Sequence, residues 1–232
     1  MPRRRSSIIR KAKSSWQGIH CFQGKELVQG NWNSQHFFED HLAGAKSIEV
    51  EIGSGSGDFL LNAAKKKPHT LFVGIEYSAR FLKYIRDKCR EEGLKNICLI
   101  YADARLFVEK CLPPQSVNSI HIYFPDPWPK SSQKRRRFLN ERGLKALENI
   151  LKSRGFIHFV TDHPGYAKDV QKHLIHFKNF SLIERKVISR TKKANSFKDF
   201  TYAAYGNVTH FGQRFLKEGK QLYLFEIEKK VS

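Results

Sequence analysis

The 232-residue sequence lacks the features of a membrane protein and of a disulfide-rich protein. No apolar run approaches the roughly twenty residues that span a bilayer, and no apolar segment follows the basic N-terminus as it would in a secretory signal. The four cysteines include no Cys-x-x-Cys pair, and the ten histidines show no metal-ligand spacing, so His121 and His158 are expected to be hydrogen-bonded core residues. We therefore expect a cytoplasmic protein with reduced thiols, no metal and no membrane association.

Acidic residues are few relative to basic ones. The chain contains 22 Asp and Glu against 42 Lys and Arg, which gives a net charge of +20. This excess is larger than solubility requires and indicates a polyanionic partner, for which nucleic acid is the leading candidate and an anionic membrane surface the alternative. With 40% hydrophobic residues the chain has ample material for a core, and both a monomer and a homodimer remain open.

The pattern of apolar residues divides the chain into two parts. Residues 1–45 have no clean period of 2 or 3.6 and are predicted to form a basic N-terminal arm with a lead-in segment. Residues 46–232 alternate between strand and helix patterns, which predicts one α/β domain with a mostly parallel central sheet and helices on both faces. Strands are expected at 47–52, 70–75, 96–101, 117–124, 155–161, 180–187 and 221–227, and helices at 58–67, 78–92, 134–152 and after Tyr166. A basic and aromatic loop is predicted at 190–219.

A glycine-rich turn joins the first strand of this domain to its first helix. Gly53, Gly55 and Gly57 let the backbone bend tightly and let a ligand lie against it. A dinucleotide-binding G-x-G-x-x-G motif beginning at Gly53 would need a glycine where Asp58 stands, and no G-K-[ST] follows for a phosphate-binding loop. An acid at this helix N-terminus would also repel a pyrophosphate. The turn therefore favours a nucleoside ligand without phosphates.

Four carboxylates stand at or just after the ends of successive predicted strands: Glu51, Glu76, Asp103 and Asp126. Glu76 has the position at which an acid holds the ribose diol of a nucleoside. Three of these acids have a structural alternative, because Glu51 could pair with a core lysine, Glu76 could cap the helix that begins after Ser78, and Asp103 could cap the segment after Tyr101. Together the acids would make a negative site in a strongly positive protein. Such a site suits a cationic nucleoside, of which S-adenosylmethionine is the common one.

The loop after the fourth of these strands reads FPDPWPKSSQKRRR and leaves the sheet where ligands bind in open α/β folds. It holds one carboxylate, Asp126, between two prolines, and one indole, Trp128, which could wall a pocket or pack beneath the loop. Five cations of this loop would attract phosphates: Lys130, Lys134, Arg135, Arg136 and Arg137. The alternative for these cations is a solvated basic face that runs into the next helix.

These motifs resemble those of the bacterial tRNA (guanine-N7)-methyltransferases, which are class I methyltransferases that use S-adenosylmethionine. The resemblance covers residues from about 45 to 229 and rests on E-I-G-S-G-S-G-D-F-L (51–60), G-I-E (74–76), A-D-A (102–104), F-P-D-P-W-P-K (124–130), K-R-R-R (134–137) and T-D (161–162). Of these, F-P-D-P-W-P-K is highly specific. The resemblance implies a Rossmann-like fold and methylation of guanine 46 in the variable loop of tRNA.

The resemblance also implies roles for individual residues. Asp126 would be catalytic. Contacts to the cofactor would come from Glu51, Gly53, Gly55, Gly57, Glu76, Asp103 and Asp126. Contacts to the substrate guanine would come from Lys130, Asp162, Thr209, His210, Phe211 and Gly212, and contacts to RNA from Lys134, Arg135, Arg136 and Arg137. Two departures from the family pattern stand out, because Gly212 replaces the acid of T-x-F-E and Gln133 replaces a histidine. The first concerns base recognition rather than the reaction class.

Two other functions fit parts of the sequence. An RNA-binding protein with a relic methyltransferase fold would not need the strand-end acids and the three glycines, yet all are present. An amino-group methyltransferase acting on nucleic acid would have [DNS]-P-P-[YFW] where this chain has Asp126-Pro127-Trp128. Guanine N7 has a free lone pair and no proton to lose, so its methylation depends on positioning and charge placement more than on a general base. We expect Asp126 to supply that charge and Asp162 to accept hydrogen bonds from the base.

Overall fold

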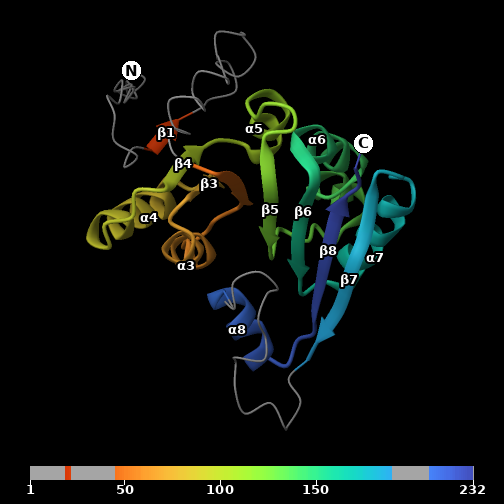
Figure 1. Ribbon diagram of the computed structural model, residues 1–232. Helices are drawn as coiled ribbons and strands as arrows, with labels where there is room; N and C mark the ends of the chain where they lie inside the picture. Colours follow the sequence, from red (N-terminus) through yellow and green to blue (C-terminus); the bar gives the residue numbers. More distant parts are fainter. Residues whose placement is uncertain (1–18, 22–44, 190–208, 232) are drawn as a thin grey trace, which may run out of the picture.

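The computed structural model describes residues 19–21, 45–189 and 209–231 (Figure 1). Its elements follow one another in the order β1 (Ile19–Cys21), β2 (Ser47–Ile52), α3 (Asp58–Lys66), β3 (Thr70–Glu76), α4 (Ala79–Glu91), β4 (Ile97–Tyr101), α5 (Ala104–Lys110), β5 (Val117–Tyr123), the 3₁₀ helix η1 (Ser131–Arg136), α6 (Glu141–Ile150), β6 (Leu151–Thr161), α7 (Pro164–Ile175), β7 (Phe180–Ile188), α8 (His210–Lys217) and β8 (Leu222–Lys229). Apart from β1, the predicted N-terminal arm lies outside the described residues, as does the segment 190–208 of the predicted loop.

The strands form one eight-stranded sheet in the order β1-β4-β3-β2-β5-β6-β8-β7. Neighbours from β1 to β6 are parallel, and only β8 runs antiparallel, to β6 and to β7. The predicted α/β class with a mostly parallel sheet is therefore confirmed. The order reverses between β2 and β5, which lie side by side, and ligands of open α/β sheets bind at the carboxyl ends of the strands at such a reversal. The glycine turn follows β2 and the FPDPWPK loop follows β5, so both predicted motifs leave the sheet there.

Helices cover both faces of the sheet and bury two apolar clusters. On one face α3 and α4 pack over β3 and β4, with Leu82, Ile85 and Cys89 of α4 turned inward. On the other face α5, α6 and α7 bury side chains such as Phe107, Leu144, Leu147 and Val170. Both layers are visible in Figure 1, where α8 lies apart from them, beyond the carboxyl ends of β5 and β6. None of the described helices is long and apolar enough to cross a membrane.

The helix predicted at 134–152 is wrong at both ends. The basic run forms the short helix η1, and α6 begins only after Asn140, whose side chain accepts a hydrogen bond from the backbone N–H of Gly143. The chain doubles back so tightly that a Cβ on Gly143 would lie 1.9 Å from the carbonyl oxygen of Phe138. Leu151, predicted to lie on the buried side of the helix, is the first residue of β6 and is buried there.

Three elements of the structure were not predicted. Strand β1 has three residues at the edge of the sheet, too few for an alternating pattern to be recognised. Helix α5 follows directly on Asp103, and helix α8 lies inside the predicted loop 190–219. Both helices begin at a side chain that accepts hydrogen bonds from the first turn, Asp103 for α5 and Thr209 for α8. These caps are the local signals that could have revealed the two helices.

A series of polar contacts runs from the partly exposed Lys67 into the interior of the sheet. Lys67 Nζ contacts Glu49 Oε1 at 3.1 Å, Glu49 Oε2 lies 2.8 Å from His121 Nε2, and His121 Nδ1 lies 2.9 Å from the Tyr123 hydroxyl. Burial lowers the pKa of His121 and, with the neighbouring His121, lowers the pKa of His158 to about 3. Both histidines are thus neutral at pH 7, and His121 is the hydrogen-bonded core residue that the sequence predicts.

Candidate active site

The glycine turn is fixed by the neighbouring strand and by Glu76. The backbone N–H of Gly53 donates to the carbonyl oxygen of Ile75 at 2.8 Å, and the N–H of Gly55 donates to Glu76 Oε2 at 2.9 Å. Gly53, Gly55 and Gly57 have φ angles of 77°, 51° and 77°, which L side chains rarely adopt. The predicted need for glycine at these three positions is confirmed by this backbone.

Replacing Gly57 by alanine is expected to destabilise the fold more than replacing Gly53. Both residues have φ +77, which costs about 1–2 kcal/mol with a side chain present. A Cβ at Gly57 would also lie 2.7 Å from Ile85 Cγ1, whereas one at Gly53 would have no atom within 4 Å. Urea unfolding should give Gly57→Ala a further loss of about 1–3 kcal/mol. Equal losses for the two variants would mean that Ile85 moves aside without cost.

Glu51 is a buried carboxylate without a hydrogen-bond partner for its Oε2 atom. Its residue is 4% exposed, and the neighbouring Ser54 Oγ, 6% exposed as a residue, is also unpartnered. Burial raises the pKa of Glu51 well above its usual range, and the charges of Asp58 and Glu76 raise this pKa further. The Ser54 hydroxyl lowers the pKa in part, although it does not meet this carboxyl with the geometry of a hydrogen bond. A cation placed here would reverse the effect and stabilise the carboxylate.

Two other predicted acids, Glu76 and Asp103, accept hydrogen bonds from nearby backbone N–H groups. Glu76 Oε1 accepts a hydrogen bond from the N–H of Ser78, the residue before α4, so that Glu76 ties the glycine turn to this helix. Asp103 Oδ1 accepts bonds from the N–H groups of Arg105 and Leu106 and caps α5. The structural alternatives considered for these acids therefore describe part of what they do. The pairing with a buried lysine considered for Glu51 belongs instead to Glu49, which contacts Lys67.

The start of α8 lies directly on the glycine turn, although 152 residues separate them. The N–H of His210 donates to Asp58 Oδ2 at 2.8 Å, and the Phe211 ring would be 4.0 Å from a Cβ on Gly55. Between them is a cavity of about 80 Å³, lined by Glu51, Gly53, Ser54, Gly55, Ser56, Asp58, Phe59, Tyr123, Phe124, Thr209 and Phe211. Ligand pockets usually exceed about 300 Å³, so this cavity can hold only part of a nucleoside.

The loop that carries Asp126 has an unusual backbone. Phe124 and Trp128 have φ angles of 51° and 41°, although neither is glycine, and Asp126 lies between them with an exposed side chain. The N–H of Phe124 donates to the carbonyl oxygen of Val160 at 2.8 Å, which fixes the loop where it leaves β5. The Trp128 ring is half-buried and lies 4.8 Å from the Arg136 guanidinium, so it packs against a cation of the same loop.

The predicted substrate-binding residues fall into two groups. Asp162 at the end of β6 forms an ion pair with Lys220 at 3.0 Å, and Lys130 is exposed at the start of η1. Thr209 and Gly212 are buried at the start of α8, where the Thr209 hydroxyl accepts the N–H of Gly212. Thr209 and Phe211 line the cavity at the glycine turn together with Glu51. Asp103, Asp126, Lys130 and Asp162 do not line it.

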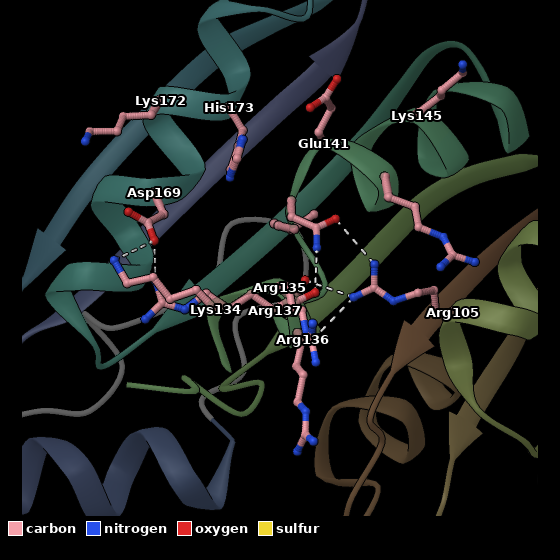
Figure 2. A pocket seen from close by; sticks show the side chains of 13 residues that line it. Arg105, Lys134, Arg135, Arg136, Arg137, Glu141, Lys145, Asp169, Lys172 and His173 are labelled. Atoms are coloured by element: carbon pink, nitrogen blue, oxygen red, sulfur yellow. Dashed lines mark hydrogen bonds and ion pairs between the residues drawn. The ribbon is translucent and has the colours of Figure 1, made fainter. Parts of the chain in front are cut away.

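The four basic residues predicted to bind RNA border a second, much larger hollow. This groove has a volume of about 1130 Å³ and is lined by Arg105, Lys134, Arg135, Arg136, Arg137, Leu139, Asn140, Glu141, Arg142, Lys145, Asp169, Lys172 and His173 (Figure 2). Sequence reasoning missed Lys145 of α6 and Lys172 of α7, which lie on opposite sides of the groove in Figure 2 and are exposed. No local pattern marks them, because their contribution depends on how α6 and α7 pack.

Arg137 differs from the other three basic residues of the run. Its side chain is 2% exposed, against 44% for Lys134, and Arg135 and Arg136 are exposed. The guanidinium of Arg137 is thus turned into the protein, whereas its predicted RNA contact stays a prediction. Among the described residues, no cluster of His, Cys, Asp and Glu is arranged to hold a metal ion.

Several solved structures similar in fold are methyltransferases. The 16S rRNA methyltransferase KamB matches with a TM-score of 0.63 and 13% identity, covering 85% of this chain and 94% of that one. The antibiotic-resistance methyltransferase Kmr matches with a TM-score of 0.57 and 16% identity, covering 87% and 94%. The sheet order, with the glycine turn at its reversal and acids at the strand ends, is that of a class I methyltransferase fold.

Sequence relatives identify the family. A family model described as "Putative methyltransferase" matches residues 45–225. A tRNA (guanine-N(7)-)-methyltransferase of Nitrosomonas eutropha is 31% identical over 218 residues, which cover 93% of this chain and 92% of the relative. A protein of the same name from Nitrosococcus oceani is 32% identical over 148 residues, which cover 64% and 63%. The chain belongs to the tRNA (guanine-N7)-methyltransferase family.

Proposed function

We propose that this protein transfers a methyl group from S-adenosylmethionine to N7 of guanine 46 in the variable loop of tRNA. The family supports the reaction, because a relative of that name aligns over 93% of the chain. S-adenosylmethionine is proposed as the methyl donor because of the buried Glu51 carboxyl. The Oε2 atom of this carboxyl has no hydrogen-bond partner and lies beside the glycine turn. A buried acid without a partner suits a cationic nucleoside and would be costly without one.

The residues at the turn fit the proposed cofactor. Gly53, Gly55 and Gly57 bring the backbone close to a ligand, and Glu76, held by the N–H of Gly55, stands at the edge of the same turn for a ribose diol. Glu51 would neutralise a positive charge of the donor. When bound, S-adenosylmethionine supplies an activated methyl group.

Asp126 is the residue proposed to act on the reacting base. Guanine becomes cationic as N7 takes a methyl group, and a carboxylate near the ring stabilises that developing charge without moving a proton. Asp126 is exposed, and none of the described side chains neutralises its carboxylate, so it is available to the base. Asp162 would accept hydrogen bonds from the Watson–Crick edge, and Lys130 would contact the same nucleotide. The Phe211 ring, which lies against the glycine turn and is 40% exposed, would pack against the base.

The groove beside η1 is proposed to bind the phosphate backbone of the tRNA. Several of its cations are engaged within the protein, such as Arg142, which forms a bidentate pair with Glu109 at 2.6 Å. Arg135, Lys145 and Lys172 have exposed side chains with no acidic partner among the described residues. Charges on three separate elements around a hollow suit a curved polyanion better than a small anion.

The salt dependence of tRNA binding tests this surface. Replacing Arg135, Lys145 and Lys172 together by alanine should reduce the slope of log K against log salt by about two units, because each neutralised phosphate contributes roughly 0.7. Affinity for S-adenosylmethionine should not change. A matched control replaces Lys83, Arg90 and Lys95, exposed residues of and just after α4, and removes the same net charge. Equal changes of slope in the two variants would mean that net charge, rather than the groove, attracts the RNA.

The proposed reaction is tested with a defined substrate. Purified protein, labelled S-adenosylmethionine and a tRNA with a variable-loop guanine are incubated together, and the nucleosides are separated by mass spectrometry. The expected product is 7-methylguanosine at position 46, which chain cleavage at that base would locate. A methyl group on an exocyclic amine would identify an amino-group methyltransferase. Binding of tRNA without cofactor binding or turnover would identify an RNA-binding protein with a relic fold.

A further inference from the structure

One arginine of the basic run is turned into the protein beneath the loop that carries Asp126. The Arg137 side chain is 2% exposed, and its guanidinium lies 4.9 Å from the ring of Tyr166, a buried residue of α7. An arginine remains charged at any ordinary pH, so it is buried only where partners compensate its lost hydration. The partners of Arg137 therefore show what this buried charge is used for.

Two of these partners belong to the loop itself. Arg137 Nε donates to the carbonyl oxygen of Pro127 at 2.7 Å, and Nη2 donates to that of Trp128 at 3.4 Å. The other two belong to α7, where Nη1 donates to the carbonyl oxygen of Gly165 at 3.1 Å and to Asp169 Oδ2 at 2.6 Å. A single planar guanidinium thus ties the loop after β5 to a helix on the face of the sheet.

The position of Asp126 depends on these backbone contacts. Its carboxylate forms no ion pair with any described side chain, so the backbone of the loop sets the direction in which this side chain leaves the chain. That backbone is strained at both ends, with positive φ at Phe124 and at Trp128, a region that residues other than glycine rarely adopt. A strained conformation persists only where the surrounding structure holds it. Here Arg137 holds the carbonyl oxygen of Pro127, the residue that follows Asp126.

We propose that Arg137 is a positioning residue for methyl transfer. It holds the loop in the conformation that presents Asp126 and does not contact the RNA backbone. Asp169 of α7 forms an ion pair with this guanidinium. Its Oδ2 atom also lies 3.3 Å from Lys134 Nζ at the edge of the groove. The inference rests on the proposed role of Asp126, and it assigns the inward-facing cation of the run to the chemical step rather than to binding.

The test compares Arg137→Lys with the parent. Lysine retains the charge but lacks the planar fork that bonds two loop carbonyls and Asp169 at once. The kcat for tRNA methylation should fall at least about tenfold, whereas the KM for tRNA and the Kd for S-adenosylmethionine should change less than about threefold. Asp169→Asn, which leaves the bonds to the loop in place, should lose less. Arg86→Lys, which alters an arginine paired with Asp87 on α4, is the matched control and should leave kcat unchanged.

A second measurement follows the loop without any reaction. In a background with Trp16→Phe and Trp32→Phe, the single remaining indole is Trp128, whose carbonyl group Arg137 holds. Quenching of its fluorescence by acrylamide should rise about twofold in Arg137→Lys and not in Arg86→Lys, because a released loop exposes the ring. Unchanged quenching with unchanged kcat would overturn the proposal, as would a loss confined to tRNA binding. If the parent methylates no tRNA, the proposed function fails, whereas the quenching comparison still decides whether Arg137 holds the loop.

Discussion

Asp126→Asn is expected to lower the kcat for tRNA methylation by at least about a hundredfold, a loss typical of removing one preorganised charge from an active site. The asparagine side chain has the same shape, so the change removes only the negative charge that would stabilise the methylated base. The loop should keep its conformation, because Arg137 bonds the carbonyl of Pro127 and not the Asp126 carboxylate. Stability should therefore stay within about 0.5 kcal/mol of the parent, as for other exposed positions.

Affinity for tRNA separates this role from a binding role. The cations that would contact phosphates are other residues, so the Kd for tRNA in Asp126→Asn should stay within about threefold of the parent value. Asp87→Asn, which neutralises an exposed acid on α4, controls for the change in net charge. Single-turnover rates and filter binding measure the two quantities separately. Equal losses of binding and turnover would contradict the assignment of Asp126 to the chemical step.

Glu51→Gln is expected to weaken binding of S-adenosylmethionine at least tenfold at pH 8, or about 1.4 kcal/mol. In the parent the raised pKa of Glu51 means that the ligand-free carboxyl retains a proton to higher pH than usual. A bound cation would favour the carboxylate, so binding should release a proton, and the affinity should increase as pH rises toward that pKa. Calorimetry in buffers of different ionisation enthalpy counts this proton. The glutamine variant should release none and should bind independently of pH.

The same substitution should stabilise the ligand-free protein. Because the folded-state pKa of Glu51 lies above the unfolded value, the folded protein binds more protons, and stability from this group is lost as pH rises through the folded pKa. Glu51→Gln removes that loss and should raise the free energy of unfolding at neutral and alkaline pH. Glu49→Gln is the matched control, because Glu49 is equally buried on β2 but contacts Lys67 and His121. This control should lose stability and retain the proton release, and the opposite pattern would exclude Glu51 from the cofactor site.

The predictable part of the site consists of features written in short stretches of sequence. The glycines at 53, 55 and 57 follow a buried strand, and only glycine adopts their backbone angles readily, so the turn can be recognised locally. Asp126 lies between two prolines just after β5, the strand beside β2. Because the two strands are parallel, the glycine turn after β2 and the loop after β5 leave the sheet at the same edge. Family resemblance added the identity of the reaction, which no single motif contains.

Local patterns misled where one residue type suits two environments. Leu151 fits the buried side of a helix and the interior of a strand equally well, and the strand prevails because its backbone pairs with Val117 of β5. The four cations 134–137 are equivalent as a charge run, yet it is the Arg137 side chain that bonds the loop carbonyls of Pro127 and Trp128. The contact of His210 with Asp58 joins positions 152 residues apart. Sequence alone determined the α/β class, the glycine turn and the strand-end acids, because backbone angles and apolar periods are local properties. Only the tertiary structure determined the burial of Arg137, the position of α8 on the glycine turn and the groove, because these depend on which elements pack together.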